Sequence, residues 1–222
     1  MSGTWEELAR SRSGAGDELI LRRRGGIYEI RCNGYDLMSN RAHRSEEALA
    51  ELALEQVAAP SPRILIGGLG MGYTLRAALD RAPADARVTV AEILPAVIAW
   101  NRGPLAPLAG RPLDDPRVDL RESDVDALLD GVAGFDAVLL DVDNGPAAVV
   151  HAGNDPLYSA RGLRRLRRAL APSGALAVWS ADRAPHFEAL LDDAHFRWEA
   201  SAIAARGVAG DPLHVIYTAR RA

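Results

Sequence analysis

Lysine is absent from this chain of 222 residues, and all 26 basic residues are arginine. The absence of lysine excludes a mechanism that needs a lysine Schiff base. Cysteine occurs once, at Cys32, so an intramolecular disulfide is impossible and a cysteine-based metal cluster nearly so. The histidines show no ligand spacing such as a pair four residues apart on a helix, so we expect no metal site.

Long apolar runs are also missing, because runs such as RILIGG and DAVLLD are far shorter than a membrane span. The first 18 residues are polar and contain no apolar signal region. We therefore expect a cytoplasmic protein without a membrane partner. The net charge of −4 gives no general attraction to nucleic acid. The arginine-rich segment ARGLRRLRRAL has leucines on its other helical face and no interleaved aromatic residues, so nucleic-acid binding is not expected either.

The composition is that of a globular protein with a full core, since 48% of the residues are hydrophobic and 25% are charged. Residues 1–17 mix glycine, serine and charges, which predicts a flexible N-terminus. Residues 18–60 predict a β-hairpin appendage, either a hairpin or a three-strand meander over 18–39, followed by a linking helix that begins near Ser45. Residues 61–222 form the main domain in this interpretation.

Short apolar runs alternate with helical patterns from Arg63 onward. The helices are expected near 72–81, 95–101, 124–130, 160–170 and 185–193. This alternation predicts a parallel sheet with both faces covered. The last two apolar runs follow each other without a helix, so we expect them to pair antiparallel. The predicted fold class is therefore α/β, a Rossmann-like methyltransferase fold with a mostly parallel seven-stranded sheet, an antiparallel C-terminal strand pair and a small N-terminal β-hairpin appendage.

The segment ILIGGLGMGYTL places a glycine-rich turn between the first strand of this domain and the following helix. Glycines allow the backbone to turn tightly and a ligand to approach without obstruction by Cβ. The helix N-terminus then offers free N–H groups to polar or anionic ligand atoms. We therefore predict that Gly68, Leu69, Gly70 and Gly72 bind a nucleoside cofactor.

Glu92 ends the second strand of the main domain, twenty residues after Gly72, where an acid accepts hydrogen bonds from ribose hydroxyls. Ile93 follows it and belongs to the same predicted site. NAD would fit the glycine turn and Glu92 alone. Ser123 and Asp124 follow the third strand, where a carboxylate would accept from an adenine amine. Either residue is also a typical helix N-cap, and the two roles are compatible.

Asp141, Asp143 and Asn144 follow the fourth strand in FDAVLLDVDNGP. The carboxyl ends of central strands are where such sheets bind ligands. A carboxylate there can take a proton from an amine nucleophile or stabilise a positive sulfur. Asp-Asn-Gly-Pro is also favourable turn chemistry, so we interpret Asp141 as catalytic and Asn144 with Gly145 as a turn, although Asn144 remains a candidate for substrate contact.

The order of IGGLGMG, VAEILPAVIAWNR, ESDVDALL, DAVLLDVDNGP and NDPLYSARGLRRL resembles the spermidine synthase (polyamine aminopropyltransferase) family, from about Leu19 to Gly174. The resemblance implies a class I S-adenosyl-methionine-dependent methyltransferase fold, with S-adenosyl-methionine or its decarboxylated form as co-substrate. It also implies a small-molecule amine acceptor and a homodimer. Asp141 would match the family's catalytic acid, and Tyr158 would match a tyrosine in the loop that closes over the site.

The sequence departs from the family at two positions. Gly70 stands where the family's glycine loop has an Asp, and Asn144 stands where a second Asp follows the catalytic acid, with Asp143 as a possible substitute. Methyl transfer from intact S-adenosyl-methionine therefore competes with aminopropyl transfer. His43 precedes the helix expected beside the site, where it would contact the donor or acceptor, or lie on the surface.

Three functions remain open from the sequence. The first is a transferase that alkylates a small amine with a methyl or aminopropyl group, for which the three acids at successive strand ends are the distinguishing feature. The second is a non-catalytic nucleoside-binding descendant, suggested by Gly70 and Asn144. The third is an NAD-dependent oxidoreductase, which Glu92 permits and which the antiparallel tail opposes.

Overall fold

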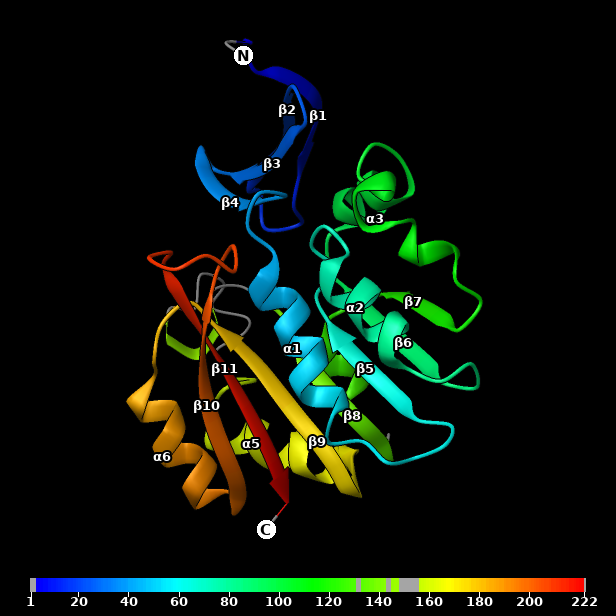
Figure 1. Ribbon diagram of the computed structural model, residues 1–222, viewed down its shortest axis with the longest axis vertical. Helices are drawn as coiled ribbons and strands as arrows, with labels where there is room; N and C mark the ends of the chain where they lie inside the picture. The colour runs from blue at the N-terminus through cyan, green and yellow to red at the C-terminus, as the bar shows by residue number, and fades with distance from the viewer. Residues whose placement is uncertain (1–2, 131–132, 143–144, 148–155, 222) are drawn as a thin grey trace.

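The computed structural model describes residues 3–130, 133–142, 145–147 and 156–221. Two sheets follow each other along the long axis, with the N-terminus at one end and the C-terminus at the other (Figure 1). The N-terminal sheet is antiparallel throughout. Its strands are, in spatial order, β1 (Glu6–Arg12), β2 (Glu18–Arg24), β3 (Ile27–Cys32) and β4 (Tyr35–Ser39).

The strand β1 lies within the segment that the sequence predicted to be flexible, so the appendage has four strands where we expected two or three. Only Leu8 and Ala9 of β1 pack against the core. Charged cross-strand pairs supplement these contacts, such as Arg23 of β2 with Glu6 of β1 at 2.7 Å. A strand with so few apolar residues has no alternating hydrophobic pattern, and the sequence therefore gave no signal for it.

The larger sheet has seven strands in the order β10-β11-β9-β8-β5-β6-β7. Their bounds are β5 (Arg63–Gly67), β6 (Arg87–Glu92), β7 (Val118–Glu122), β8 (Phe135–Leu140), β9 (Leu170–Ser180), β10 (Phe196–Ala204) and β11 (Leu213–Arg221). The strands from β7 to β9 pair in parallel, and β11 runs antiparallel to both β9 and β10. The predicted α/β class, mostly parallel sheet and antiparallel C-terminal pair are confirmed.

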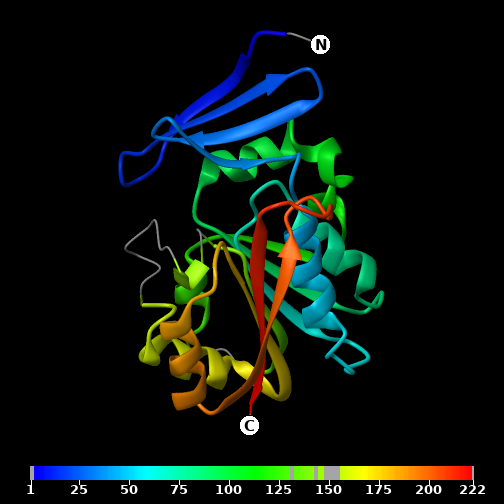
Figure 2. The same cartoon turned by 60° about the vertical axis from the view of Figure 1, so that its left-hand side comes forward.

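Helices cover both faces of the larger sheet (Figures 1 and 2). They are α1 (Arg44–Leu54), α2 (Tyr73–Arg81), α3 (Pro95–Arg102), α4 (Val125–Leu128), α5 (Ala160–Ala169) and α6 (Pro185–Asp193). Short 3₁₀ turns occur at Ala106–Ala109, Pro112–Asp114 and Gly145–Ala147. None of the helices in the described ranges is long and apolar enough to cross a membrane.

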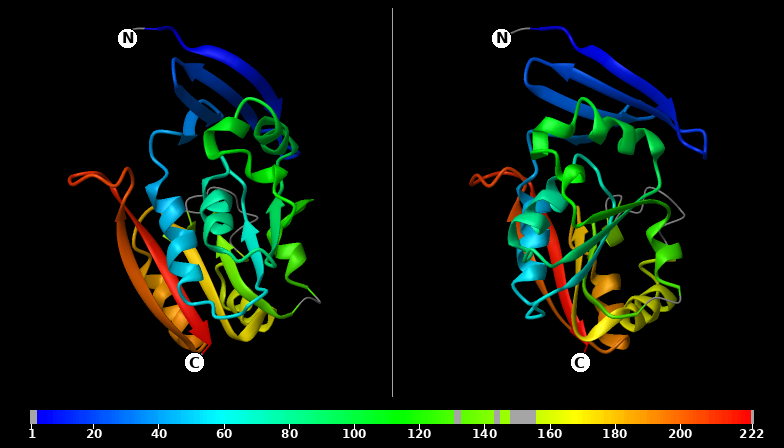
Figure 3. Two further views of the ribbon diagram at one scale, coloured as in Figure 1. Left: turned by 45° about the vertical axis from the view of Figure 1, so that its right-hand side comes forward. Right: turned by 90° about the vertical axis from the view of Figure 1, so that its right-hand side faces the viewer.

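The core divides into two layers, one on each face of the larger sheet. In β5, Ile64 and Ile66 belong to the layer formed with α1, α2 and α3, whereas Leu65 belongs to the layer with α5 and α6. This alternation follows from the two-residue period of a strand. Leu21 and Ile30 of the N-terminal sheet are fully buried in the first layer. The N-terminal sheet thus packs firmly against one end of the larger sheet (Figure 3).

Candidate active site

A cavity of about 410 Å³ lies between the N-terminal sheet and the carboxyl ends of β5, β6, β7 and β8. The β5–α2 turn, the first turn of α1 and residues at the facing ends of β9 and β11 complete its wall. Parallel strands bring their carboxyl ends to one edge, so loops distant in sequence meet there. This cavity contains most of the residues that the sequence predicted for the site.

The glycine turn forms one side of the cavity, where Gly68, Leu69 and Gly70 line it. Gly68 has φ +89°, and a Cβ there would lie 2.2 Å from the backbone oxygen of Asp141. Only glycine therefore allows the turn to touch the end of β8. Gly72 has φ +86° and caps the N-terminus of α2, but it lies outside the cavity wall.

Glu92 is held in a fixed orientation at the end of β6. Its Oε2 accepts from the backbone N–H of Leu69 at 2.9 Å, and its Oε1 accepts from the N–H of Leu94 at 2.8 Å. Burial raises the pKa of Glu92, and the backbone hydrogen bonds oppose that rise. Glu92 also lines the cavity, where a ligand hydroxyl can donate a hydrogen bond to its carboxylate. The neighbouring Ile93, with 61% of its surface exposed, adds an apolar wall to the cavity.

Ser123 and Asp124 line the cavity after β7. The Oδ1 atom of Asp124 accepts from the backbone N–H of Asp126 at 2.8 Å, so Asp124 is the N-cap of α4. The backbone N–H of Ser123 donates to the carbonyl of Glu92 at 3.0 Å, which fixes this turn beside β6. The cap leaves Asp124 at the cavity wall, where the predicted contact with adenine stays a hypothesis.

Asp141 follows β8 and lines the cavity beside the glycine turn. Its Oδ2 accepts from the hydroxyl of Thr74 at 2.6 Å. Burial, together with the nearby charge of Glu92, raises the pKa of Asp141 to about 6. A carboxylate with a pKa near neutrality is suited to take a proton from an amine. The predicted partners Asp143 and Asn144 lie outside the described residues.

Two predicted residues lie near the cavity without lining it. The ring of Tyr158 is buried, and its hydroxyl donates to the carbonyl of Val142 at 3.2 Å. The ring of His43 stacks on Tyr73 with 4.0 Å between centroids, and its Nδ1 lies 2.9 Å from a carboxylate oxygen of Glu47. Tyr158 therefore supports the backbone at Val142, and His43 supports a tyrosine that does line the cavity.

Several cavity residues were missed by the sequence analysis, among them Glu46, Trp179 and His214. Trp179 and His214 lie on neighbouring strands with their ring centroids 4.7 Å apart. Glu46 follows Ser45, near which the sequence predicted only the start of a linking helix. A signal existed in the sequence, because the apolar residues Ala50 and Ala53 follow Glu46 at helical spacing, and the structure buries both of them fully. Glu46 therefore shares the inward face of α1.

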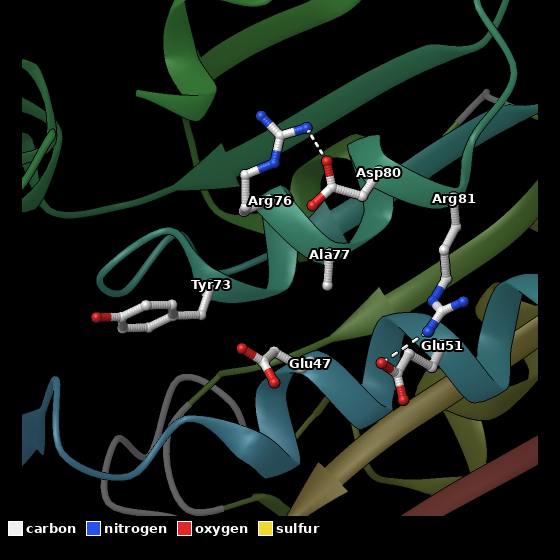
Figure 4. Close-up of a pocket in the computed structure, with 7 residues that line it drawn as sticks. All are labelled: Glu47, Glu51, Tyr73, Arg76, Ala77, Asp80 and Arg81. Atoms are coloured by element: carbon white, nitrogen blue, oxygen red, sulfur yellow. Dashed lines mark hydrogen bonds and ion pairs between the residues drawn. The ribbon is translucent and has the colours of Figure 1, made fainter. Parts of the chain in front are cut away.

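A second cavity of about 290 Å³ lies between α1 and α2 and is lined mainly by charged side chains (Figure 4). Arg81 of α2 pairs with Glu51 of α1 at 2.7 Å, and Arg76 pairs with Asp80. Tyr73 lines both this cavity and the larger one. The Arg81–Glu51 pair therefore joins α2 to α1, whereas the Arg76–Asp80 pair lies within α2.

The larger cavity is strongly acidic, and no arginine lines it in the part of the chain that the structure describes. Its carboxyl groups belong to Asp17, Glu46, Glu92, Asp124 and Asp141. Burial lowers the pKa of His214, so this histidine adds no positive charge at pH 7. No group of three or more acidic, histidine or cysteine side chains among the described residues could hold a metal ion. The electrostatics favour a cationic organic ligand.

The parallel strands with an antiparallel β11, the glycine turn after β5 and the acids at the next strand ends define a fold of the class I S-adenosyl-methionine-dependent methyltransferase type. The four-stranded N-terminal sheet that covers the cavity distinguishes a subgroup of this class.

Solved structures identify that subgroup as the spermidine synthase fold. A spermidine synthase in complex with the transition-state analogue AdoDATO matches with a TM-score of 0.74 and 15% identity, over 97% of this chain and 72% of that chain. A spermidine synthase from Thermotoga maritima matches with a TM-score of 0.77 and 14% identity, with the same coverage of 97% and 72%. No protein-family model and no curated protein matches the chain. At these identities the likeness concerns the fold alone.

Proposed function

We propose that this protein is a spermidine-synthase-like transferase that binds S-adenosyl-methionine or its decarboxylated form and alkylates a small-molecule amine. The observation that carries the proposal is the convergence of Glu92, Asp124 and Asp141 with the glycine turn on one acidic cavity. Such a donor supplies an alkyl group on a positively charged sulfur. In this proposal Glu92 holds the ribose hydroxyls, Asp124 accepts from the adenine amine, and Asp141 takes a proton from the attacking amine.

The cavity fits the nucleoside at the glycine turn. A Cβ on Gly70 would lie 3.4 Å from the Sδ atom of Met38 in the N-terminal sheet, and both residues line the cavity. A side chain at position 70 would therefore narrow the gap between the turn and the N-terminal sheet. Leaving that gap open suits a flat adenosine group between Ile93 and Leu69, which also line the cavity.

The charge of the cavity favours the decarboxylated donor over the intact one. Intact S-adenosyl-methionine has a carboxylate, and the part of the cavity wall that is described offers five acids and no arginine to pair with it. The decarboxylated donor ends in an ammonium group, which an acidic wall attracts. Aminopropyl transfer is therefore the first candidate reaction and methyl transfer the second.

Product analysis with each donor tests the proposal. With a panel of primary amines, methylthioadenosine formed from the decarboxylated donor indicates aminopropyl transfer, and S-adenosyl-homocysteine formed from the intact donor indicates methyl transfer. The variant Asp141→Asn keeps the shape of the side chain and removes its basicity, so turnover should fall about a hundredfold or more while methylthioadenosine binding changes little. An equal loss of binding and turnover would assign Asp141 to donor binding instead.

Two alternatives are separated by simpler measurements. An NAD-dependent oxidoreductase would have to place an anionic pyrophosphate in an acidic cavity, so NADH should bind far more weakly than methylthioadenosine in a fluorescence titration. A non-catalytic descendant would bind methylthioadenosine without forming product from either donor over the amine panel. The cytoplasmic location, the homodimer and the division into domains stay predictions.

A further inference from the structure

The first turn of α1 brings a second titratable carboxyl group to the same part of the cavity as Asp141. Glu46 and Asp141 both line the cavity, and Thr74 touches both segments. The hydroxyl of Thr74 donates to Asp141 Oδ2 at 2.6 Å and lies 3.4 Å from the carbonyl oxygen of Glu46. The backbone of Glu46 and the carboxylate of Asp141 thus lie beside the same threonine hydroxyl, and the charge of Asp141 acts on the carboxyl group of Glu46.

Glu46 is also connected to a histidine on another strand. The hydroxyl of Ser45 lies 2.6 Å from Glu46 Oε2 and 2.9 Å from His214 Nδ1. Ser45 is fully buried, whereas His214 lines the cavity from β11. A hydroxyl can accept one hydrogen bond while it donates another. The chain His214–Ser45–Glu46 is therefore a continuous path along which a proton can move.

The charges around Glu46 are almost all negative or neutral. Burial, and then the charge of Asp141, raises the pKa of Glu46 to about 7. The other titratable groups that face it are Glu47 on its own helix, Tyr73 on α2 and His214 on β11. None of these supplies a positive charge at pH 7 in the described structure. An ammonium group placed between Glu46 and Asp141 would satisfy both carboxylates.

We propose that Glu46 is a second catalytic carboxylate of the site, which holds the ammonium group of the acceptor amine together with Asp141 and takes its proton. This inference rests on the proposed transferase function. Glu46 was not among the site residues predicted from the sequence. The acceptor class that follows is a primary aliphatic amine that is protonated in solution, and the path through Ser45 carries the released proton from Glu46 to His214, on another side of the cavity wall.

The reaction balances with this assignment. One proton passes from the acceptor ammonium to the carboxylate of Glu46, which leaves a neutral amine with a lone pair. The amine nitrogen then attacks the carbon next to the sulfonium sulfur, so a C–N bond forms and the C–S bond breaks. The electron pair of the C–S bond stays on sulfur, which becomes a neutral thioether. As the C–N bond forms, Asp141 takes a second proton from the nitrogen, so the alkylated product is a neutral secondary amine, and the protons on Glu46 and Asp141 then pass to solvent.

Calorimetric titration in two buffers of different ionisation enthalpy measures the proton transfer directly. The complex of the full chain with methylthioadenosine is titrated at pH 7 with 1,4-diaminobutane, 1,3-diaminopropane and ethanolamine in turn. A bound cation lowers the pKa of Glu46, which is about half protonated at pH 7, so we expect a release of about half a proton per amine bound. The variant Glu46→Gln should lose this proton release and bind the amine at least about tenfold more weakly.

Two further variants make the result specific to Glu46. Glu55→Gln makes the same change of charge at the exposed C-terminal end of α1, outside the cavity, and should behave as the wild type. Glu46→Asp keeps a carboxyl group and should retain proton release with weaker amine binding. Methylthioadenosine binding within about twofold of wild type shows that a variant is folded. If Glu46→Gln fails this check, Glu46→Asp decides the question by its proton release.

The outcomes separate this inference from the proposed function. Unchanged amine affinity and proton release in Glu46→Gln would overturn the role of Glu46, as would loss of proton release in a folded Glu46→Asp. A wild-type protein that binds methylthioadenosine but none of the three amines would overturn the inference and leave nucleoside binding intact. A wild-type protein that does not bind methylthioadenosine would reject the proposed function itself.

Discussion

The pH dependence of stability should reveal the buried carboxyl group of Glu46 without any ligand. Burial and the charge of Asp141 raise its pKa from 4.5 to about 7 in the folded protein. The folded state therefore binds the proton more tightly than the unfolded chain does. The contribution of Glu46 to stability is therefore greatest at low pH and is lost as the pH rises from about 4.5 to about 7. Since one pKa unit corresponds to about 1.4 kcal/mol, the ionised side chain destabilises the fold by about 3 kcal/mol at pH 8.

The variant Glu46→Gln removes this titration, and its Oε1 can still accept from Ser45. Relative to wild type, the variant should become more stable as the pH rises, with the difference in unfolding free energy widening by about 2.5 kcal/mol between pH 5 and pH 8. Urea unfolding at several pH values measures that difference. Glu55→Gln should show no such widening, because Glu55 is exposed. A difference for Glu46→Gln that stays constant with pH would refute the raised pKa and the proximity to Asp141.

Three other substitutions test the geometry of the site. Gly68→Ala should destabilise the fold by at least about 2 kcal/mol, because its Cβ would lie 2.2 Å from a backbone oxygen. The control Gly16→Ala has a similar φ of +95° but lies in open space, so it should destabilise the fold less. Equal urea midpoints for the two variants would refute the close contact at Gly68. Asp124→Ala should weaken methylthioadenosine binding by about 1–3 kcal/mol in a titration, and unchanged affinity would limit Asp124 to its capping role. Tyr158→Phe should lower the free energy of unfolding by about 1 kcal/mol, because the hydrogen bond to the carbonyl of Val142 is lost, and the affinity for methylthioadenosine should not change. If turnover fell more than tenfold while stability stayed the same, Tyr158 would instead contact the substrate.

The main part of the site was predictable because it is built from strand ends. Apolar runs mark the parallel strands, and chemistry at their carboxyl ends must meet at one edge. Gly68 and Asp141 directly follow a strand, Glu92 ends one and Asp124 comes two residues after one, and the structure places all four at the same cavity. Their spacing in the sequence therefore gave their spatial arrangement without knowledge of any long-range contact.

The residues that were missed come from elements whose orientation depends on tertiary packing. Glu46 lies on α1, which precedes the parallel strands, and the face that it presents is decided by packing against α2 and the sheet. His214 reaches the cavity only because β11 inserts between β9 and β10. The strand β1 has just Leu8 and Ala9 against the core. Local patterns predict elements and their periodicity, but they do not predict which elements become neighbours.

The central claim is that the cavity binds the adenosyl group of a sulfonium donor, and a crystal structure of the protein soaked with methylthioadenosine tests it most directly. We predict the ribose hydroxyls within hydrogen-bonding distance of the Glu92 carboxylate and the adenine amine beside Asp124. Methylthioadenosine bound elsewhere, or a cavity that stays empty at saturating concentration, would contradict the account.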